Sequence, residues 1–308
     1  MKYILITGVL GFIGSNLLER LLKDENNIII GIDNLSSGSL KDFMINDRFI
    51  FIKDDVINEI KINEKIDEIY HLACPASPSY YQLNHINTLK TNFLGTLNVL
   101  ELAKKNNCKI LLTSTSEVYG DPNISPQNEE YLGNVNSFGI RSCYDEGKRV
   151  AESLMYAYNK HHNIDIKIVR IFNTYGTYMD KNDGRVISNF INQAIRNEDI
   201  TIYGDGSYTR SFQYIDDLIN GLLLLMESDY KKPINIGNPE EYTILYLAEL
   251  IIKLTNSKSK IIYLPSVEDD PKKRKPNIDK AIEILHWKPT INLLDGLEKT
   301  IQYYNKIL

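Results

Sequence analysis

Residues 3–23 read YILITGVLGFIGSNLLERLLK and contain three regularly spaced glycines, Gly8, Gly11 and Gly14. The β-branched run before Gly8 predicts a buried strand, and the apolar spacing after Gly14 predicts a helix. In such a strand–turn–helix unit, the first glycine allows the tight turn and the second lets the backbone approach a pyrophosphate. The third permits close helix–strand packing. The free N–H groups at the helix N-terminus then favour an anion.

An acidic residue follows this unit at a characteristic distance. A second predicted strand, at 27–33, ends in Asp33, roughly 20 residues after the last glycine of the turn. An acid at this place binds the ribose hydroxyls of a dinucleotide and disfavours a 2′-phosphate. The pattern therefore predicts NAD, rather than NADP, as the cofactor. The residues assigned to its site are Gly8, Gly11, Phe12, Ile13, Gly14, Asp33 and Asn34.

Short apolar runs and helix-length segments alternate through the first half of the chain. The predicted strands lie at 3–7, 27–33, 49–53, 68–72, 109–114 and 166–172. The predicted helices between them include 14–23, 87–106 and 144–161. Because the strands are continuously apolar, we expect them to be parallel and buried on both faces. The alternation predicts an α/β fold with a Rossmann-type, doubly wound parallel sheet.

The regular alternation of predicted strands and helices changes after residue 172. The later predicted elements are a helix at 186–197, a strand at 200–204, a helix ending near 227 and a strand at 233–237. Residues 242–308 read as helices joined by a charged loop at 267–277.

Two domains are expected from this change of pattern. We expect residues 1–172 plus about 212–236 to form an NAD-binding domain. A smaller, discontinuous α/β domain that binds the substrate is expected from about 173–211 plus 237–308.

Composition excludes several classes of protein. The chain has 308 residues, of which 43% are hydrophobic and 24% charged, as in an ordinary globular protein. Its net charge of −5 lacks the basic surplus of a nucleic-acid binder, and no stretch approaches the ~20 apolar residues of a membrane span. Cys74, Cys108 and Cys143 are too scattered for a disulfide framework or a zinc site. We expect a cytoplasmic protein without metal, membrane or nucleic-acid partners.

A second motif carries candidate chemistry. Tyr144 and Lys148 are spaced i, i+4 on a predicted helix, so the phenol and the ammonium share a face. A nearby lysine favours the phenolate, lowers the pKa of the tyrosine and would make it a base for a substrate hydroxyl. We also assign both residues to the cofactor site, where Lys148 could hold the nicotinamide ribose. The strand at 109–114 runs into Thr115, Ser116 and Glu117, which place two hydroxyls and an acid beside the cofactor.

The glycine spacing G-x-x-G-x-x-G resembles that of extended short-chain dehydrogenase/reductases. In that family the pair Asp55-Val56 flanks the adenine, and the segment His71-Leu72-Ala73 faces the cofactor. The resemblance then becomes closer and covers nearly the whole chain. The segments HLACPASPSYY (71–81), STSEVYGDP (114–122), RSCYDEGKR (141–149), RIFNTYG (170–176), DGRVISNF (183–190), TRSFQY (209–214) and DDPKKRKPNI (269–278) resemble the UDP-glucuronate decarboxylases.

This resemblance implies a redox-neutral cycle on UDP-glucuronate. The sugar is oxidised at C4, the resulting β-keto acid loses CO2, and the hydride returns to give UDP-xylose. In the family pattern Tyr144 takes the hydroxyl proton, and Thr115 and Ser116 hydrogen-bond the reacting oxygen. Glu117 acts near C5, and its division of labour with Tyr144 and Arg274 stays open.

The resemblance also implies a set of substrate contacts. Arg210 is assigned to the diphosphate and Arg274 to the reacting end, because arginine binds phosphate and carboxylate as a planar fork. The remaining expected contacts are Tyr81, Asn84, Arg141, Asn173, Arg185, Asn189 and Tyr203.

The sequence departs from the family pattern at two places, and several alternative functions have to be weighed. Val9-Leu10 stands where the family has Gly-Ala, and Thr177-Tyr178 replaces Pro-Arg. A 4,6-dehydratase would show Thr-Asp-Glu where this chain has Thr-Ser-Glu, and a 4-epimerase would lack Glu117. An oxidative decarboxylase that releases the 4-keto sugar stays open, whereas the intact motifs argue against an NAD-sensing regulator. The apolar helices at 87–106 and 144–161 lead us to expect a homodimer.

Overall fold

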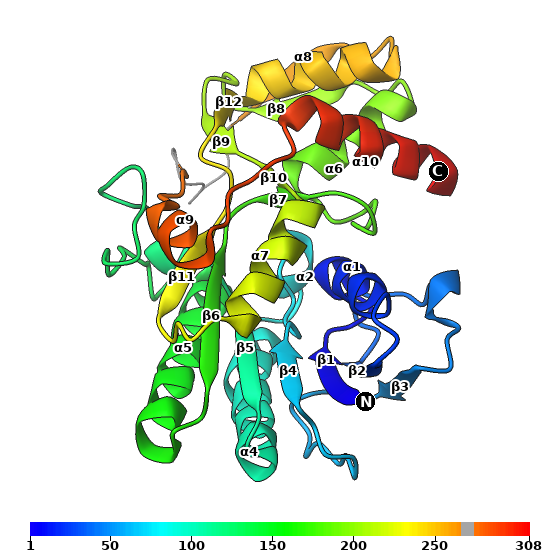
Figure 1. The fold of residues 1–308 in the computed structure, drawn as a ribbon. Helices are drawn as coiled ribbons and strands as arrows, with labels where there is room; N and C mark the ends of the chain where they lie inside the picture. Colours follow the sequence, from blue (N-terminus) through cyan, green and yellow to red (C-terminus); the bar gives the residue numbers. More distant parts are fainter. Residues whose placement is uncertain (266–273) are drawn as a thin grey trace.

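The computed structural model describes residues 1–265 and 274–308 (Figure 1). Within these residues, seven parallel strands form one sheet in the order β11-β6-β5-β4-β1-β2-β3. They are β1 (Lys2–Thr7), β2 (Asn27–Asp33), β3 (Phe49–Lys53), β4 (Glu68–His71), β5 (Lys109–Thr115), β6 (Ile166–Ile171) and β11 (Pro233–Ile236). The strand order reverses between β1 and β4, as in doubly wound sheets. The predicted α/β, Rossmann-type fold is confirmed.

Helices cover both faces of this sheet. In Figure 1, α1 (Phe12–Leu21) and α7 (Ile215–Glu227) pack together on one face, and α4 (Thr96–Asn106) and α5 (Ser142–His162) on the other. Leu17 and Leu222 lie in the core on the first side, and Leu100 and Met155 lie in the core on the second. The continuously apolar strands therefore have an apolar layer on each face.

The chain between β4 and α4 forms a run of short helical segments. These are α2 (Pro78–Tyr81), α3 (His85–Lys90) and the π-helical turn η2 (Thr91–Gly95). The predicted helix at 87–106 is thus α3, η2 and α4 in succession. Thr88 Oγ1 donates to the Tyr81 carbonyl oxygen at 3.1 Å, which ties α2 to α3. Two short 3₁₀ turns are η1 (Asp42–Met44) and η3 (Ser116–Tyr119).

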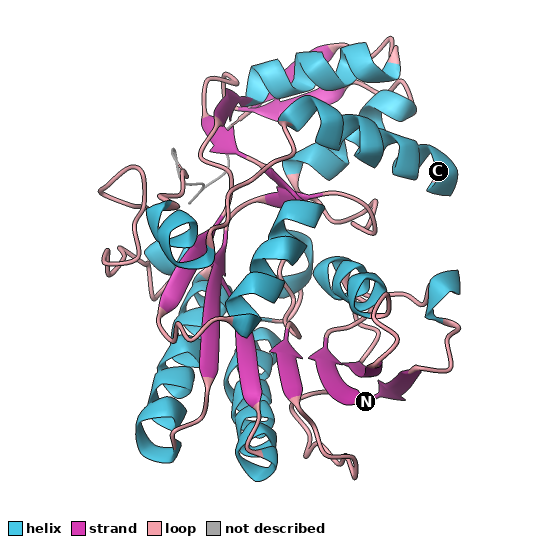
Figure 2. Cartoon of the chain, viewed as in Figure 1, coloured by secondary structure: helices cyan, strands magenta, loops and turns pink. Residues whose placement is uncertain are grey.

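A smaller group of elements gathers at the carboxyl ends of the strands (Figure 2). Its helices are α6 (Val186–Ile195), α8 (Ile244–Thr255) and α10 (Leu293–Ile307), while α9 (Asp279–Leu285) packs beside β11. Three short strand pairs complete it: β7 (Thr174–Tyr175) with β10 (Gln213–Tyr214), β8 (Ile200–Tyr203) with β13 (Ile261–Leu264), and β9 (Thr209–Ser211) with β12 (Glu241–Thr243).

The prediction for residues 242–308 was partly wrong. Helices were expected there, but β13 pairs in parallel with β8 over four residues. Its sequence, IIYL, consists of β-branched, aromatic and aliphatic residues, and pairing with a distant strand decides its conformation. Of the predicted charged loop at 267–277, residues 267–273 lie outside the described residues.

Candidate active site

A cavity of about 1280 Å³ lies where the carboxyl ends of β1, β4, β5 and β6 meet the smaller group of elements. Ligands of open α/β sheets bind at this edge, beside the point where the strand order reverses. The volume exceeds the roughly 300–1000 Å³ of a site for one small ligand, so a dinucleotide and a second ligand both have room.

The cavity brings nearly all the predicted site residues together. From the predicted cofactor set it is lined by Gly8, Gly11, Phe12, Ile13, Gly14, Asp33, Asn34, Asp55, Val56, Leu72, Ala73, Tyr144 and Lys148. From the predicted reacting and substrate sets it is lined by Thr115, Ser116, Glu117, Tyr81, Arg141, Asn173, Arg185, Asn189, Tyr203, Arg210 and Arg274.

Asn84 is the exception among the predicted residues. It does not line the cavity, because its side chain caps α3 and its Oδ1 accepts the N–H of Asn87 at 3.0 Å. An asparagine just before a helical run is a common N-cap, so the sequence held this alternative signal.

The glycine turn fits a dinucleotide through its lack of side chains. Gly8 has φ +70°, and a Cβ on it would lie 2.9 Å from the backbone of Ala73 on the β4 side. A Cβ on Gly14 would lie 2.2 Å from the Gly8 carbonyl oxygen. Gly11 caps α1 without a side-chain hydrogen bond, which leaves the first N–H groups of that helix open to an anion.

Asp33 is fixed at the rim of this turn. Its Oδ2 accepts the Leu10 N–H at 3.0 Å, and its Oδ1 accepts the Leu35 N–H at 2.9 Å. Next to it, Asn34 Nδ2 donates to Asp55 Oδ2 at 2.8 Å. These bonds hold the two carboxylates that would meet the adenosine part of NAD.

The Lys148 ammonium is held by the backbone of β5. Its Nζ donates to the Thr113 carbonyl oxygen at 2.8 Å and lies 6.0 Å from the centroid of the Tyr144 ring. Burial raises the pKa of Tyr144, and a hydrogen bond to Thr115 opposes this only in part. Desolvation of the phenolate is the largest effect on Tyr144, so the structure does not show the lowered tyrosine pKa that the Tyr144–Lys148 spacing predicts.

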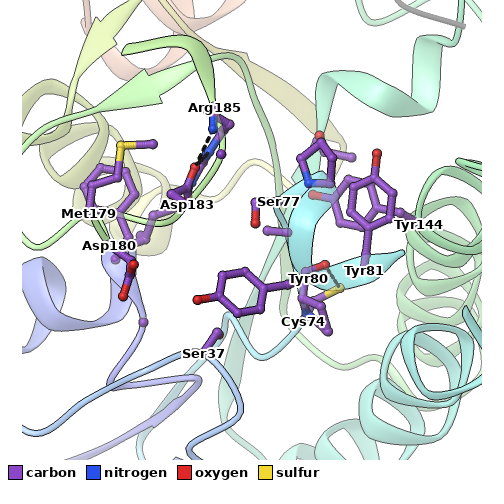
Figure 3. Close-up of a pocket in the computed structure, with 18 of the residues that line it drawn as sticks. Ser37, Cys74, Ser77, Tyr80, Tyr81, Tyr144, Met179, Asp180, Asp183 and Arg185 are labelled. Carbon is purple, nitrogen blue, oxygen red and sulfur yellow. Dashed lines mark hydrogen bonds and ion pairs between the residues drawn. The ribbon is translucent and has the colours of Figure 1, made fainter. Parts of the chain in front are cut away.

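Tyr144 packs against a second phenol on the same wall of the cavity (Figure 3). The ring of Tyr81, at the end of α2, lies parallel to it with 5.0 Å between the centroids. Tyr81 is 1% exposed, and its hydroxyl finds no hydrogen-bond partner within the described residues. A buried donor without a partner is uncommon in a folded protein, and Tyr81 is one of the residues that line the cavity.

Glu117 forms ion pairs with two guanidinium groups. Arg141 Nη2 donates to its Oε2 at 2.6 Å, and Arg274 contacts both of its carboxylate oxygens, one of them at 2.9 Å. Although burial works to raise it, the two cations lower the pKa of Glu117 to about 2. The Thr115 Oγ1 accepts the Glu117 N–H at 3.3 Å and fixes the start of η3.

Asp145 is a second acid at this cluster, and sequence reasoning missed it. It is 7% exposed, and its Oδ2 lies 4.0 Å from Arg141 Nε. Burial and the nearby charge of Glu117 raise the pKa of Asp145 to about 7. Its position next to Tyr144 in the motif was the one signal available from the sequence.

Three further polar residues assigned to the substrate, Arg185, Arg210 and Asn189, also line the cavity. Arg185 forms a two-point ion pair with Asp183, at 2.5 and 2.8 Å (Figure 3). Arg210 is 9% exposed and donates to the Thr209 carbonyl oxygen at 2.9 Å. Asn189 Nδ2 donates to the Gly184 carbonyl oxygen at 2.9 Å, and Tyr203 is 53% exposed at the cavity mouth.

Lys41 is a further cation of the cavity wall that the sequence did not single out. Its Nζ donates to the carbonyl oxygens of Leu10 at 3.1 Å and Ser39 at 2.8 Å. It lies 5.6 Å from the centroid of the ring of Tyr178, the residue that stands where the family has an arginine. Burial lowers the pKa of Lys41 to about 8.

In residues 1–265 and 274–308, no group of three or more His, Cys, Asp or Glu side chains could hold a metal ion. Among the helices of that part of the chain, none is long and apolar enough to cross a membrane.

Solved structures resemble the chain over nearly its whole length. The UDP-glucose 4-epimerase of Thermotoga maritima, with UDP-glucose, has a TM-score of 0.92 at 29% identity and covers 99% of both chains. The UDP-glucuronic acid 4-epimerase of Bacillus cereus, in complex with UDP-glucuronic acid and NAD, has a TM-score of 0.89 at 31% identity. It covers 99% of this chain and 100% of that one.

Sequence comparisons agree. The UDP-glucuronic acid decarboxylase 1 of Danio rerio is 51% identical over 100% of this chain and 73% of its own length. The UDP-glucuronic acid decarboxylase 5 of Arabidopsis thaliana is 53% identical over 96% and 86%. The model of the NAD dependent epimerase/dehydratase family matches residues 4–237. The chain therefore belongs to the NAD dependent epimerase/dehydratase family and, within it, to the UDP-glucuronic acid decarboxylases.

Proposed function

We propose that this chain converts UDP-glucuronate to UDP-xylose and CO2 and retains NAD⁺ throughout the cycle. The observation that carries the proposal is the Glu117 carboxylate held by Arg141 and Arg274 in the cavity that also contains Tyr144. Tyr144 can exchange a proton at C4 of the bound sugar. The charged cluster of Glu117 and the two arginines can act at the neighbouring carbon, C5. The decarboxylase names of relatives with about 50% identity support it.

In this mechanism, some of the site residues act at C4 of the sugar and others at C5. NAD⁺, which the glycine turn and Asp33 would hold, would supply reversible hydride acceptance at C4. Tyr144 takes the proton of the C4 hydroxyl, while Thr115 and Ser116 hydrogen-bond the same oxygen. The C4 ketone lets the C5 carboxylate leave as CO2, and the bonding electrons pass into an enolate.

The enolate must then be protonated at C5 and the ketone at O4. We assign Glu117 and Arg274 to the C5 end: the Arg274 guanidinium, paired with Glu117, attracts the carboxylate and then stabilises the charge of the enolate. The proton that C5 gains comes from solvent, because loss of CO2 from a carboxylate consumes one proton. Tyr144 returns its proton to O4 as the hydride returns to C4. No net oxidation results.

The remaining assigned residues bind the nucleotide end. We assign Arg210 to the diphosphate, Asn189 and Tyr203 to the diphosphate and the uridine, and Arg185, which is paired with Asp183, to the substrate in general. Tyr81 and Asn173 orient the sugar. The capping bond of Asn84 argues for omitting it from this set.

One rival keeps a specific observation in its favour. The Bacillus cereus structure, in complex with UDP-glucuronic acid and NAD, is a 4-epimerase with 31% identity to this chain. A 4-epimerase would also begin by oxidising C4, but it would release no CO2. A 4,6-dehydratase is disfavoured by Ser116, which stands where an aspartic acid is expected.

The test is incubation with UDP-glucuronate and catalytic NAD⁺, with CO2 and the sugar product followed by NMR. CO2 with UDP-xylose and no accumulating reduced cofactor supports the proposal. CO2 with a 4-keto pentose and one equivalent of reduced cofactor would make the chain an oxidative decarboxylase. UDP-galacturonate without CO2 would make it an epimerase.

The division of the chain, its assembly and its compartment are proposals as well. We infer that 1–172 with about 212–236 binds NAD and that about 173–211 with 237–308 binds UDP-glucuronate.

Exposed Leu83, Ile86 and Phe93 on and beside α3 support a homodimer, which light scattering would test. The three free cysteines suit the reducing cytoplasm, which fractionation of the source cells would test.

A further inference from the structure

The backbone just after Arg274 is held by a buried amide that does not line the cavity. Gln127 is 1% exposed, and its Oε1 accepts the Lys275 N–H at 2.9 Å. Its Nε2 donates to the Ile124 carbonyl oxygen at 2.7 Å, so both polar atoms of the amide are used. The Gln127 N–H also donates to the Lys275 carbonyl oxygen at 2.8 Å, and its carbonyl oxygen accepts the Asn277 N–H at 2.7 Å.

A second buried amide joins the two backbones. Asn235, in β11 and fully buried, donates through Nδ2 to the carbonyl oxygens of Gln127 and Asn277, each at 3.1 Å. Its Oδ1 accepts the Tyr119 hydroxyl at 2.7 Å. Buried amides with every bond made are rigid, because losing one bond leaves an unpaired polar group.

The same network reaches the catalytic end of β5. The Tyr119 hydroxyl accepts Arg170 Nη1 at 3.0 Å, and Arg170 forms an ion pair with Glu152. Glu152 Oε1 in turn accepts the Ser114 hydroxyl at 2.5 Å, one residue before Thr115. Fixed hydrogen bonds therefore join the strand that carries Thr115 to the segment that carries Arg274.

We propose that Gln127 is a positioning residue for Arg274: it holds the 274–277 backbone so that the guanidinium of Arg274 meets Glu117. Arginine has a long, flexible side chain, so its head group is placed only if its backbone is fixed. The Ser211 hydroxyl adds a bond to the Arg274 carbonyl oxygen at 3.2 Å. The effect on the C5 step rests on the proposed function, whereas the effect on the ion pair does not.

The main variant is Gln127→Met, which keeps the length of the side chain and removes both hydrogen-bonding atoms. Misplacement of a reacting group by about 1 Å can cost up to roughly 100-fold in rate. We expect CO2 release to fall about 10- to 100-fold, while C4 oxidation persists and the absorbance of reduced cofactor rises. Gln127→Glu should restore part of the rate, because its carboxyl oxygen can still accept the Lys275 N–H.

Asn27→Ala is the matched control. Asn27 is a buried amide at the start of β2, far from the cavity, and its Nδ2 donates to the Leu21 carbonyl oxygen at 2.9 Å. Its loss should lower the thermal stability and leave the ratio of CO2 release to C4 oxidation unchanged. The inference is overturned if Gln127→Met releases CO2 at the wild-type rate, or if it loses both steps equally, as a merely structural residue would.

A crystal structure of the Gln127→Met variant tests the inference independently of the reaction. We expect the guanidinium of Arg274 to be displaced from Glu117 while Arg141 stays in place. An undisturbed Arg274–Glu117 pair would overturn the inference. Absence of CO2 from the wild-type enzyme would instead overturn the proposed function, and the crystal structure would still decide the role of Gln127.

Discussion

The rings of Tyr81 and Tyr144 are parallel to within 6°, with their centroids 5.0 Å apart. Tyr81 comes from α2 and Tyr144 from the first turn of α5, so the stack joins two segments distant in the chain. Aromatic pairs of this kind contribute about 1 kcal/mol beyond the area they bury. The stack therefore restricts the orientation of the phenol proposed to take the C4 proton.

Replacing Tyr81 by leucine should free the Tyr144 ring and slow CO2 release about tenfold or more. Tyr81→Phe keeps the stack, so its kcat should stay close to that of the wild type. Its KM for UDP-glucuronate should rise if the unpartnered hydroxyl binds the sugar. Without substrate, Tyr81→Phe should be as stable as the wild type or more stable by ~1 kcal/mol, since it removes an unsatisfied donor. Equal rates for the leucine and phenylalanine variants would contradict an orienting role.

Glu117→Gln should destabilise the protein in a pH-dependent way. The folded-state pKa of about 2 lies below the ordinary value of 4.5, so ionised Glu117 contributes stability above the ordinary value. That contribution is lost as the pH falls toward 2. We expect Glu117→Gln to cost about 3 kcal/mol near neutral pH, because it leaves Arg141 and Arg274 without their anion.

Denaturant unfolding of Glu117→Gln near neutral pH and at about pH 3 measures this difference. The gap between the variant and the wild type should narrow in acid. A gap that does not change with pH would show that Glu117 is not held ionised by the two arginines. Glu59, exposed on the surface and paired with Lys61, offers a control substitution with little expected effect.

The stability difference between Asp145→Asn and the wild type should have the opposite pH dependence to that of Glu117→Gln. The pKa of about 7 lies above the ordinary value of 3.8, so the folded protein keeps a proton that the unfolded chain has lost. The contribution of Asp145 to the stability of the wild type therefore falls as the pH rises from about 4 to 7. The groups that act on Asp145 are Glu117, Arg141, Arg274 and Glu146.

An asparagine is neutral throughout this range. Between about pH 4 and 8, the stability difference should shift in favour of Asp145→Asn by roughly 4 kcal/mol. Unfolding curves of both proteins across this range provide the measurement. A constant difference would mean that Asp145 is already ionised at low pH in the folded state.

Lys41→Met should weaken the binding of NAD⁺. Lys41 Nζ lies beside the glycine turn that would hold the cofactor diphosphate, and its pKa of about 8 leaves it charged near neutral pH. Loss of one charge-assisted bond should weaken affinity roughly tenfold by calorimetry. In the wild type, affinity should decline as the pH rises through 8 and the ammonium loses its proton.

Lys41→Arg is the matched control, because its charge persists at alkaline pH. Its affinity for NAD⁺ should stay level between about pH 7 and 9, where that of the wild type declines. If all three proteins bind NAD⁺ equally, Lys41 does not contact the cofactor and serves only to hold the loop at Leu10 and Ser39.

The first half of the fold could be read from the sequence, whereas parts of the second could not. Strands β1, β2 and β3 coincide with runs that are apolar and β-branched, and Gly8, Gly11 and Gly14 mark the turn between β1 and α1. Local composition is enough there, since parallel strands buried on both faces leave a strong signal. Strand β13 was missed because its pairing partner, β8, lies about sixty residues away, and no local pattern encodes that partner.

The amino-acid sequence by itself determined the dinucleotide turn, the acid at Asp33 and the Tyr144–Lys148 pair, because each depends on residue type and spacing along one element. The tertiary structure alone decided that Lys148 binds the Thr113 carbonyl and that burial raises the pKa of Tyr144. It also brought Arg274 onto Glu117, across 157 positions of the chain. Desolvation and ion pairing depend on what surrounds a group in space, and a linear pattern carries no record of those surroundings.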